Sequence, residues 1–128
     1  MNKKLLISLL AVLLVVISLC GCFQSDEQSI KLNSEEKRFL GTWANTSQHQ
    51  GNTITLTYVF LPDKTYEVTA ETEIDSVSYN GTWKTKDNQL VIAIEGRTQT
   101  GNYQFLNNDQ TLIISDTNNG NNTVLIKQ

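Results

Sequence analysis

Cysteine, histidine and proline are scarce in this chain of 128 residues, which has two cysteines, one histidine and one proline. Cys20 and Cys22 both lie near the N-terminus, so the chain after them has no thiol for a disulfide or for a thiolate-bound metal. His49 has no companion ligands at metal-binding spacing. We therefore expect no metal site and no cofactor, and we expect a hydrophobic core to stabilise the fold.

The same scarcity argues against an enzyme. A Ser-His-Asp or Cys-His site would have to use His49, which falls in an expected turn over 48–51. Glu67, Glu71 and Glu73 share one face of an expected strand, and paired acids can hydrolyse glycosides. A row of acids on one face of an alternating strand is more typical of the solvated side of a sheet. The sequence therefore predicts no catalytic residues.

Basic residues are also fewer than acidic ones. The chain has ten basic and 13 acidic side chains, which gives a formal net charge of −3. Such a surface lacks the basic stripe that binding to nucleic acid requires. It also lacks the attraction that basic segments have for anionic lipid headgroups. We expect no nucleic-acid partner, and attachment to a membrane would have to come from another feature.

The N-terminus carries that feature. Lys3 and Lys4 precede an uninterrupted stretch of apolar residues and serine over 5–19. The stretch is short for a membrane-spanning helix, which needs about 20 apolar residues, and it has the length of a signal-peptide core. Leu19-Cys20-Gly21-Cys22 follows at once and resembles the lipobox of prokaryotic lipoproteins. The resemblance implies a lipid on Cys22 and an extracytoplasmic protein anchored to the cell membrane; an uncleaved membrane anchor is the alternative.

These features divide the chain into three parts. Residues 1–21 are the expected lipoprotein signal peptide, residues 22–34 an expected polar tether that carries the lipid, and residues 35–128 the expected folded domain. Ser34 is an expected helix N-cap followed by acidic residues, which predicts one or two helical turns before Gly41. Phe39 and Leu40 are then expected to plug one end of the core.

Further along the chain, apolar and polar residues alternate with the period of two that is typical of strands with one buried face. The clearest example is a β-hairpin over 79–94, in which Tyr79 and Trp83 share the buried face. Asp87 and Asn88 are expected to form its turn because both residue types tolerate positive φ. Further strands are expected at 41–48, 52–61, 65–74, 97–106, 111–115 and 122–127.

Short turns and the lack of long crossovers place consecutive strands side by side in antiparallel pairs. A ribbon of eight such strands has two exposed edges unless it closes on itself. The expected fold class is therefore all-β, and the expected architecture is an antiparallel, up-and-down, eight-stranded barrel.

Several short motifs follow one another in this ribbon, at 39–43, 58–66, 81–90 and 103–112. Their order and spacing resemble the small lipocalin-like domains of prokaryotic lipoproteins over residues 39–127. The resemblance implies an eight-stranded barrel with room for a small-molecule cup, and it implies no particular activity. The chain is shorter than a true lipocalin and lacks the long C-terminal helix, which argues against a large cavity.

Large aromatic side chains are the candidate ligand-binding residues. The alternation places seven of them on the expected inner face: Trp43, Tyr58, Tyr66, Tyr79, Trp83, Tyr103 and Phe105. Tyrosine and tryptophan combine an apolar body with a polar group, so this lining suits a small amphipathic or hydrophobic ligand. Alternatively the rings simply fill the barrel, because eight strands leave little more than side-chain room. The expected function is a lipid-anchored, extracytoplasmic binding module.

Three expected strands are apolar on both faces, so something must cover their outer residues, which are Val91, Ile113 and Leu125. Either the segment around Phe39 and Leu40 covers them or a protein partner does. The second alternative predicts a structural or inhibitory accessory lipoprotein that acts through a protein–protein surface. Three sites also match the N-glycosylation pattern, which matters only in an organism that glycosylates exported proteins; they are Asn45, Asn80 and Asn121.

Overall fold

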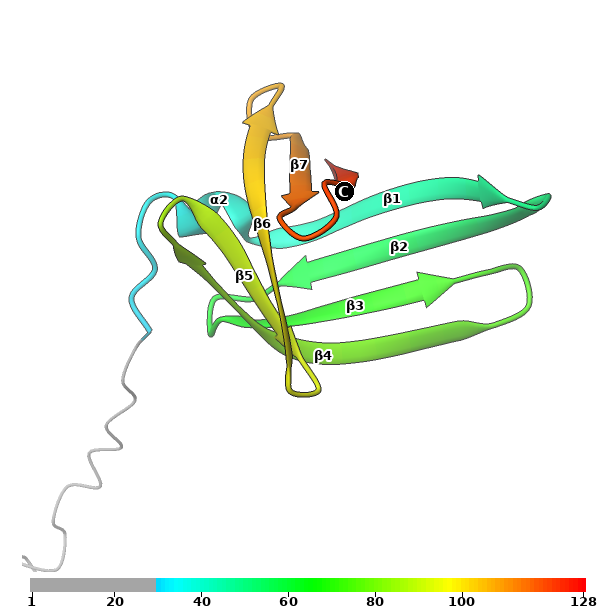
Figure 1. Cartoon of the computed structure of the whole chain (residues 1–128), viewed down its shortest axis with the longest axis horizontal. Coiled ribbons are helices and arrows are strands. Elements are labelled where there is room, and N and C mark those ends of the chain that lie inside the picture. Colours follow the sequence, from blue (N-terminus) through cyan, green and yellow to red (C-terminus); the bar gives the residue numbers. More distant parts are fainter. Residues whose placement is uncertain (1–29) are drawn as a thin grey trace, which may run out of the picture.

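The structure is a computed structural model that describes residues 30–128. The expected signal peptide, the lipid site at Cys22 and the first part of the tether lie outside the described residues. The described chain starts with a short helix and continues as eight strands (Figure 1). The elements are α2 (Glu36–Phe39), β1 (Gly41–His49), β2 (Asn52–Phe60), β3 (Thr65–Glu71), β4 (Ser76–Lys86), β5 (Gln89–Ile94), β6 (Arg97–Leu106), β7 (Thr111–Asp116) and β8 (Asn122–Lys127).

The eight strands form a closed antiparallel barrel in which each strand pairs with the next and β8 returns to pair with β1. The predicted all-β, up-and-down, eight-stranded barrel is therefore confirmed. Turn chemistry explains the topology, because residues that tolerate positive φ stand where short links are needed. Asp87 and Asn88 connect β4 to β5 with φ values of 52° and 60°, as the sequence predicted for this turn.

The barrel is asymmetric. β1 pairs with β2 along its whole length but with β8 only at Trp43 and Ala44. Residues 76–80 of β4 pair with β3 alone, and β4 pairs with β5 only from Gly81 onward. As a result β1–β4 continue past the barrel as a four-stranded sheet, which projects to the right in Figure 1.

Gly81 stands where β4 leaves this extension and joins the barrel wall. A Cβ atom at this position would overlap the backbone oxygen of Ala93 and lie 2.8 Å from the Tyr66 ring. Glycine is the residue that permits such a close approach between a strand and its surroundings. Glycine at position 81 is therefore required by packing.

An aromatic core fills the closed end of the barrel. Phe39 of α2 is fully buried at its centre. The ring centroids of Tyr103 and Phe105 both lie 4.8 Å from that of Phe39, and that of Trp83 lies 5.7 Å away. Trp43 Nε1 donates a 2.7 Å hydrogen bond to the backbone oxygen of Phe39. The predicted role of Phe39 as a plug is confirmed, because its ring is buried among these aromatic side chains.

The start of α2 is capped by Asn33. Its Oδ1 accepts a 2.8 Å hydrogen bond from the Glu36 N–H, and Glu36 Oε2 accepts a 3.2 Å bond from the Asn33 N–H. This reciprocal arrangement is that of a capping box, with an asparagine in place of serine or threonine. The predicted N-cap at Ser34 is wrong: Glu35 directly precedes α2 and makes no side-chain capping bond, while Asn33 has the spacing from Glu36 that the box requires.

Glu36 also fastens α2 to the barrel. Its buried Oε1 accepts from Lys64 Nζ at 2.9 Å and from Thr85 Oγ1 at 3.1 Å. Burial raises the pKa of Glu36, but the hydrogen bonds from Lys64, Asn33 and Thr85 outweigh it, and the net pKa lies below its ordinary value of 4.5. The carboxylate is thus charged and links α2 to two separate parts of the barrel.

Arg38 makes a second attachment at the same end. It donates to both carboxylate oxygens of Asp109, at 2.7 and 3.1 Å, and to Glu35 at 3.0 Å. Its guanidinium carbon lies 4.2 Å from the ring centroid of Phe105. The hydrogen bonds from Arg38 hold the pKa of Asp109 below its ordinary value. The short helix is therefore held to the β6–β7 turn as well.

The structure corrects the expected strands 65–74 and 122–127. The first is shorter than expected, because β3 ends at Glu71 and Ile74 is 96% exposed in the following turn. Leu125 was expected on the outer face, but it is fully buried. Its strand pairs Leu125 with the equally buried Leu112, and this register turns the neighbouring Ile126 outward.

Candidate ligand-binding cavity

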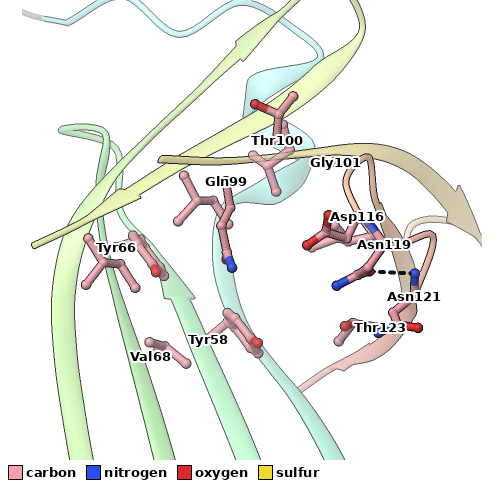
Figure 2. A pocket seen from close by; sticks show the side chains of 14 residues that line it. Tyr58, Tyr66, Val68, Gln99, Thr100, Gly101, Asp116, Asn119, Asn121 and Thr123 are labelled. Atoms are coloured by element: carbon pink, nitrogen blue, oxygen red, sulfur yellow. Dashed lines mark hydrogen bonds between the residues drawn. The ribbon is translucent and has the colours of Figure 1, made fainter. Parts of the chain in front are cut away.

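A cavity of about 420 Å³ lies inside the barrel, away from the aromatic plug. Fourteen residues line it, and they divide into an apolar wall and a polar rim (Figure 2). The apolar wall consists of Val68, Leu90, Ile92, Ile94 and Ile114, with Tyr58 and Tyr66 beside it. The polar rim consists of Gln99, Thr100, Asp116, Asn119, Asn121 and Thr123, with Gly101 between them.

Strand alternation builds the apolar wall. Leu90, Ile92 and Ile94 are every second residue of β5, so all three point to the same side. Ile114 of β7 and Val68 of β3 extend this surface from other strands. The wall lies on the buried face that the sequence pattern predicted for β5.

Two tyrosines add hydroxyl groups to this wall. Tyr58 of β2 pairs with Val68 across the β2–β3 ladder, and Tyr66 of β3 pairs with Gly81. Burial raises the pKa of Tyr58; burial, followed by the nearby Tyr58, raises the pKa of Tyr66 to about 12. Both phenols are therefore neutral at physiological pH and can donate as well as accept a hydrogen bond.

The loop between β7 and β8 forms much of the polar rim. Thr117 holds it to β6 by donating to the Thr100 backbone oxygen from its N–H at 3.1 Å and its hydroxyl at 2.9 Å. Asp116 Oδ1 accepts from two backbone N–H groups of the loop, at 2.7 and 3.4 Å. The Asn121 N–H donates to Asn119 Oδ1 at 2.8 Å, the dashed line in Figure 2. These bonds fix the loop and leave the amide nitrogen of Asn119 pointing into the cavity.

The structure separates the seven aromatic residues that the sequence proposed as a cavity lining. Tyr58 and Tyr66 line the cavity. Tyr79 lies in an adjoining hollow beside Ile92 and Ile94, and it is 43% exposed because it sits on the four-stranded extension. The other four pack around Phe39 and fill the barrel, as the alternative interpretation expected; they are Trp43, Trp83, Tyr103 and Phe105.

Sequence reasoning missed the polar rim. Asn118-Asn119-Gly120 lies between the strands expected at 111–115 and 122–127, and its residue types are typical of the turn that the structure has there. Nothing in the local pattern shows that this turn bends over the barrel interior, because that depends on the pairing of β8 with both β7 and β1. Gln99 was assigned to a strand without a function, and its amide nitrogen points into the cavity in Figure 2.

The residues considered for other chemistry lie outside the cavity. His49 ends β1 and is exposed, as are Glu67 and Glu71 on β3 and Glu73 in the turn that follows. Within residues 30–128, no three histidine, cysteine, aspartate or glutamate side chains gather in a way that would hold a metal ion. The same part of the chain has no helix with the length and apolar character needed to cross a membrane.

Comparison with known proteins identifies no family for this chain. No model of a known protein family matches it, and no curated protein matches it either.

Proposed function

We propose that this protein is a lipid-anchored, extracytoplasmic binding module whose barrel holds a small amphipathic or hydrophobic ligand. The observation that supports the proposal most is the cavity of about 420 Å³. Ligand sites in proteins typically measure about 300–1,000 Å³, with a mostly apolar lining and a few polar groups that orient the ligand. The cavity lies within this range of volume, and its lining is about half apolar and half polar, with the polar groups gathered on one side.

The two parts of the cavity would do different work in binding. Covering the apolar wall removes hydrocarbon from water, which contributes about 25 cal/mol per Å² of buried surface. The hydroxyls of Tyr58 and Tyr66 and the amides of Gln99 and Asn119 would orient the polar part of the ligand. The plug around Phe39 and the anchored β7–β8 loop keep the cavity open before binding, which lowers the ordering cost.

The N-terminal sequence supports the proposed location. Lys3 and Lys4, the apolar stretch over 5–19 and the lipobox-like segment that ends at Cys22 together suit export and lipid attachment. The tether would then hold the barrel at the membrane surface, where amphipathic molecules are concentrated.

Thermal unfolding of residues 25–128 in the presence of single compounds tests the binding proposal. A panel of fatty acids, alkyl amines, hydrophobic metabolites and short glycans covers the relevant chemistry. A true ligand at a hundred times its Kd should stabilise the fold by about 2.7 kcal/mol. The matched control is Thr123→Trp, which places an indole in the cavity and should abolish the shift. The absence of any shift across the panel would contradict the proposal.

A second candidate function is that of a structural or inhibitory accessory lipoprotein. The predicted partner patch must change, because Leu125 is buried and leaves only Val91 and Ile113 partly accessible on the outer face. One outer hollow favours this candidate: it lies along the seam of β1 and β8, beside Val124 and Ile126, which are 41% and 48% exposed. A negative ligand screen together with loss of partner binding in Ile126→Asp would favour this function.

A further inference from the structure

The residues that line the cavity carry negative charge and no positive charge. Among its 14 lining residues, Asp116 carries the only charge, and none of the lining residues is lysine, arginine or histidine. Glu95 and Arg97 line an adjoining hollow that shares Ile92 and Ile94 with the cavity. These two have opposite signs and lie in the adjoining hollow, so they supply no net positive charge.

Asp116 is positioned to meet a ligand. Its Oδ1 is engaged by the two N–H groups of the β7–β8 loop. Its Oδ2 makes no hydrogen bond with another group among residues 30–128, and Figure 2 shows the carboxylate at the edge of the cavity. Ile114, two residues earlier on β7, faces the same cavity. An apolar surface and a carboxylate oxygen therefore lie side by side on one strand.

Two further features suit a positive charge. The rings of Tyr58 and Tyr66 line the same cavity, and aromatic rings attract ammonium groups at their faces. The side-chain oxygens of Asn121 and Thr123 are neutral acceptors along the rim. An anionic head would instead meet Asp116 with no cation among the lining residues to offset the repulsion.

We propose that the cavity selects amphipathic molecules with a cationic amine head, whose charge pairs with Asp116 while the apolar body covers Ile92, Ile94 and Ile114. The inference rests on the proposed binding function and names the ligand class for the same cavity. It also predicts that fatty acids bind poorly, although their chains suit the apolar wall.

The test uses the full chain in phosphatidylcholine vesicles. Three photoreactive decyl probes share one chain and differ in the head, which is trimethylammonium, glucoside or carboxylate. Mass spectrometry measures labelling of residues 89–116. In Asp116→Asn, the Oδ1 acceptor for the loop remains and only the charge is lost. Asp87→Asn in the β4–β5 turn, outside the residues that line the cavity, makes the same change of net charge. Thr123→Trp measures labelling with the cavity filled.

We expect the ratio of ammonium to carboxylate labelling to fall about tenfold in Asp116→Asn, because couplings measured between close charges across an interface correspond to about that factor or more. The ratio should stay unchanged in Asp87→Asn. Cavity labelling with the same ratio in the wild type and Asp116→Asn would overturn the ligand class and leave the binding function standing. Labelling by all three probes that is no higher than in Thr123→Trp would overturn the binding function itself.

Discussion

Replacing the buried carboxylate that fastens α2 tests the account of the closed end most sharply. Glu36→Gln keeps the size of the side chain and one oxygen acceptor but removes the charge that faces Lys64. The two side chains are 4% and 29% exposed, with 2.9 Å between Lys64 Nζ and Glu36 Oε1. Breaking a fully buried ion pair costs about 3–5 kcal/mol, mostly because the remaining charge is stranded.

Lys64 retains access to water, and glutamine can still accept a hydrogen bond from Thr85. We therefore expect a loss of about 2 kcal/mol in the free energy of unfolding at pH 7, below the cost of a fully buried pair. In a domain of this size such a loss lowers Tm by about 8–15 °C. Urea denaturation followed by tryptophan fluorescence measures it. Glu71→Gln on the exposed side of β3 is the matched control and should change stability by about 0.5 kcal/mol or less.

The effect should depend on pH in a defined direction. The folded pKa of Glu36 lies below its ordinary value of 4.5. Its contribution to stability is therefore fully present above about pH 4.5 and disappears as the pH falls through the folded value. The pKa values of Asp63 and Asp109 are also lowered, but both remain in the variant. The stability gap between wild type and Glu36→Gln should narrow below pH 4.5, and a gap that is constant from pH 7 to pH 3 would refute the reasoning.

Three further predictions concern the core, the bend in β4 and the anchor. Trp83→Ala should cost about 3–5 kcal/mol because it empties a buried site in the aromatic core, while Glu71→Ala should cost about 0.5 kcal/mol or less; similar costs in urea denaturation would mean that the faces are wrongly assigned. Gly81→Ala should lower the free energy of unfolding by about 1–3 kcal/mol or more, because the new Cβ would overlap the Ala93 oxygen. An unchanged Tm would contradict this. Cys22→Ser should leave the precursor unprocessed and without lipid. Mass spectrometry of the native protein that finds a mature N-terminus with unmodified Cys22 would contradict the anchor.

The sequence was sufficient to predict the barrel because local signals and topology agreed. Alternation gave the strands, and residues with positive φ such as Asp87 and Asn88 gave the turns. Where both faces of a strand are apolar, it was harder to predict which residues point into the barrel. In β8, Val124, Leu125 and Ile126 are adjacent apolar residues, and only the pairing of Leu125 with Leu112 decides which of them points inward.

The cavity could be predicted only in part. Tyr58 and Tyr66 followed from the alternation, but the inner face also includes the rings that fill the closed end. The position of Phe39 decides which rings line the cavity and which pack in the closed end. The alternation of apolar and polar residues along the strands does not reveal this position. The rim residue Asp116 was not predicted, because its approach to the cavity depends on a loop that barrel closure brings over the interior.

The proposal that this cavity binds a ligand is tested most directly by methyl NMR of the isoleucines in residues 25–128 during titration with decyltrimethylammonium. Ile92, Ile94 and Ile114 line the cavity, whereas Ile113 is adjacent in sequence but faces outward and Ile126 is exposed on the outer seam. We predict saturable shifts of the three cavity methyls, with the two outer methyls unchanged. Shifts at Ile113 and Ile126 with the cavity methyls unmoved would contradict the central claim and indicate binding to the outer surface.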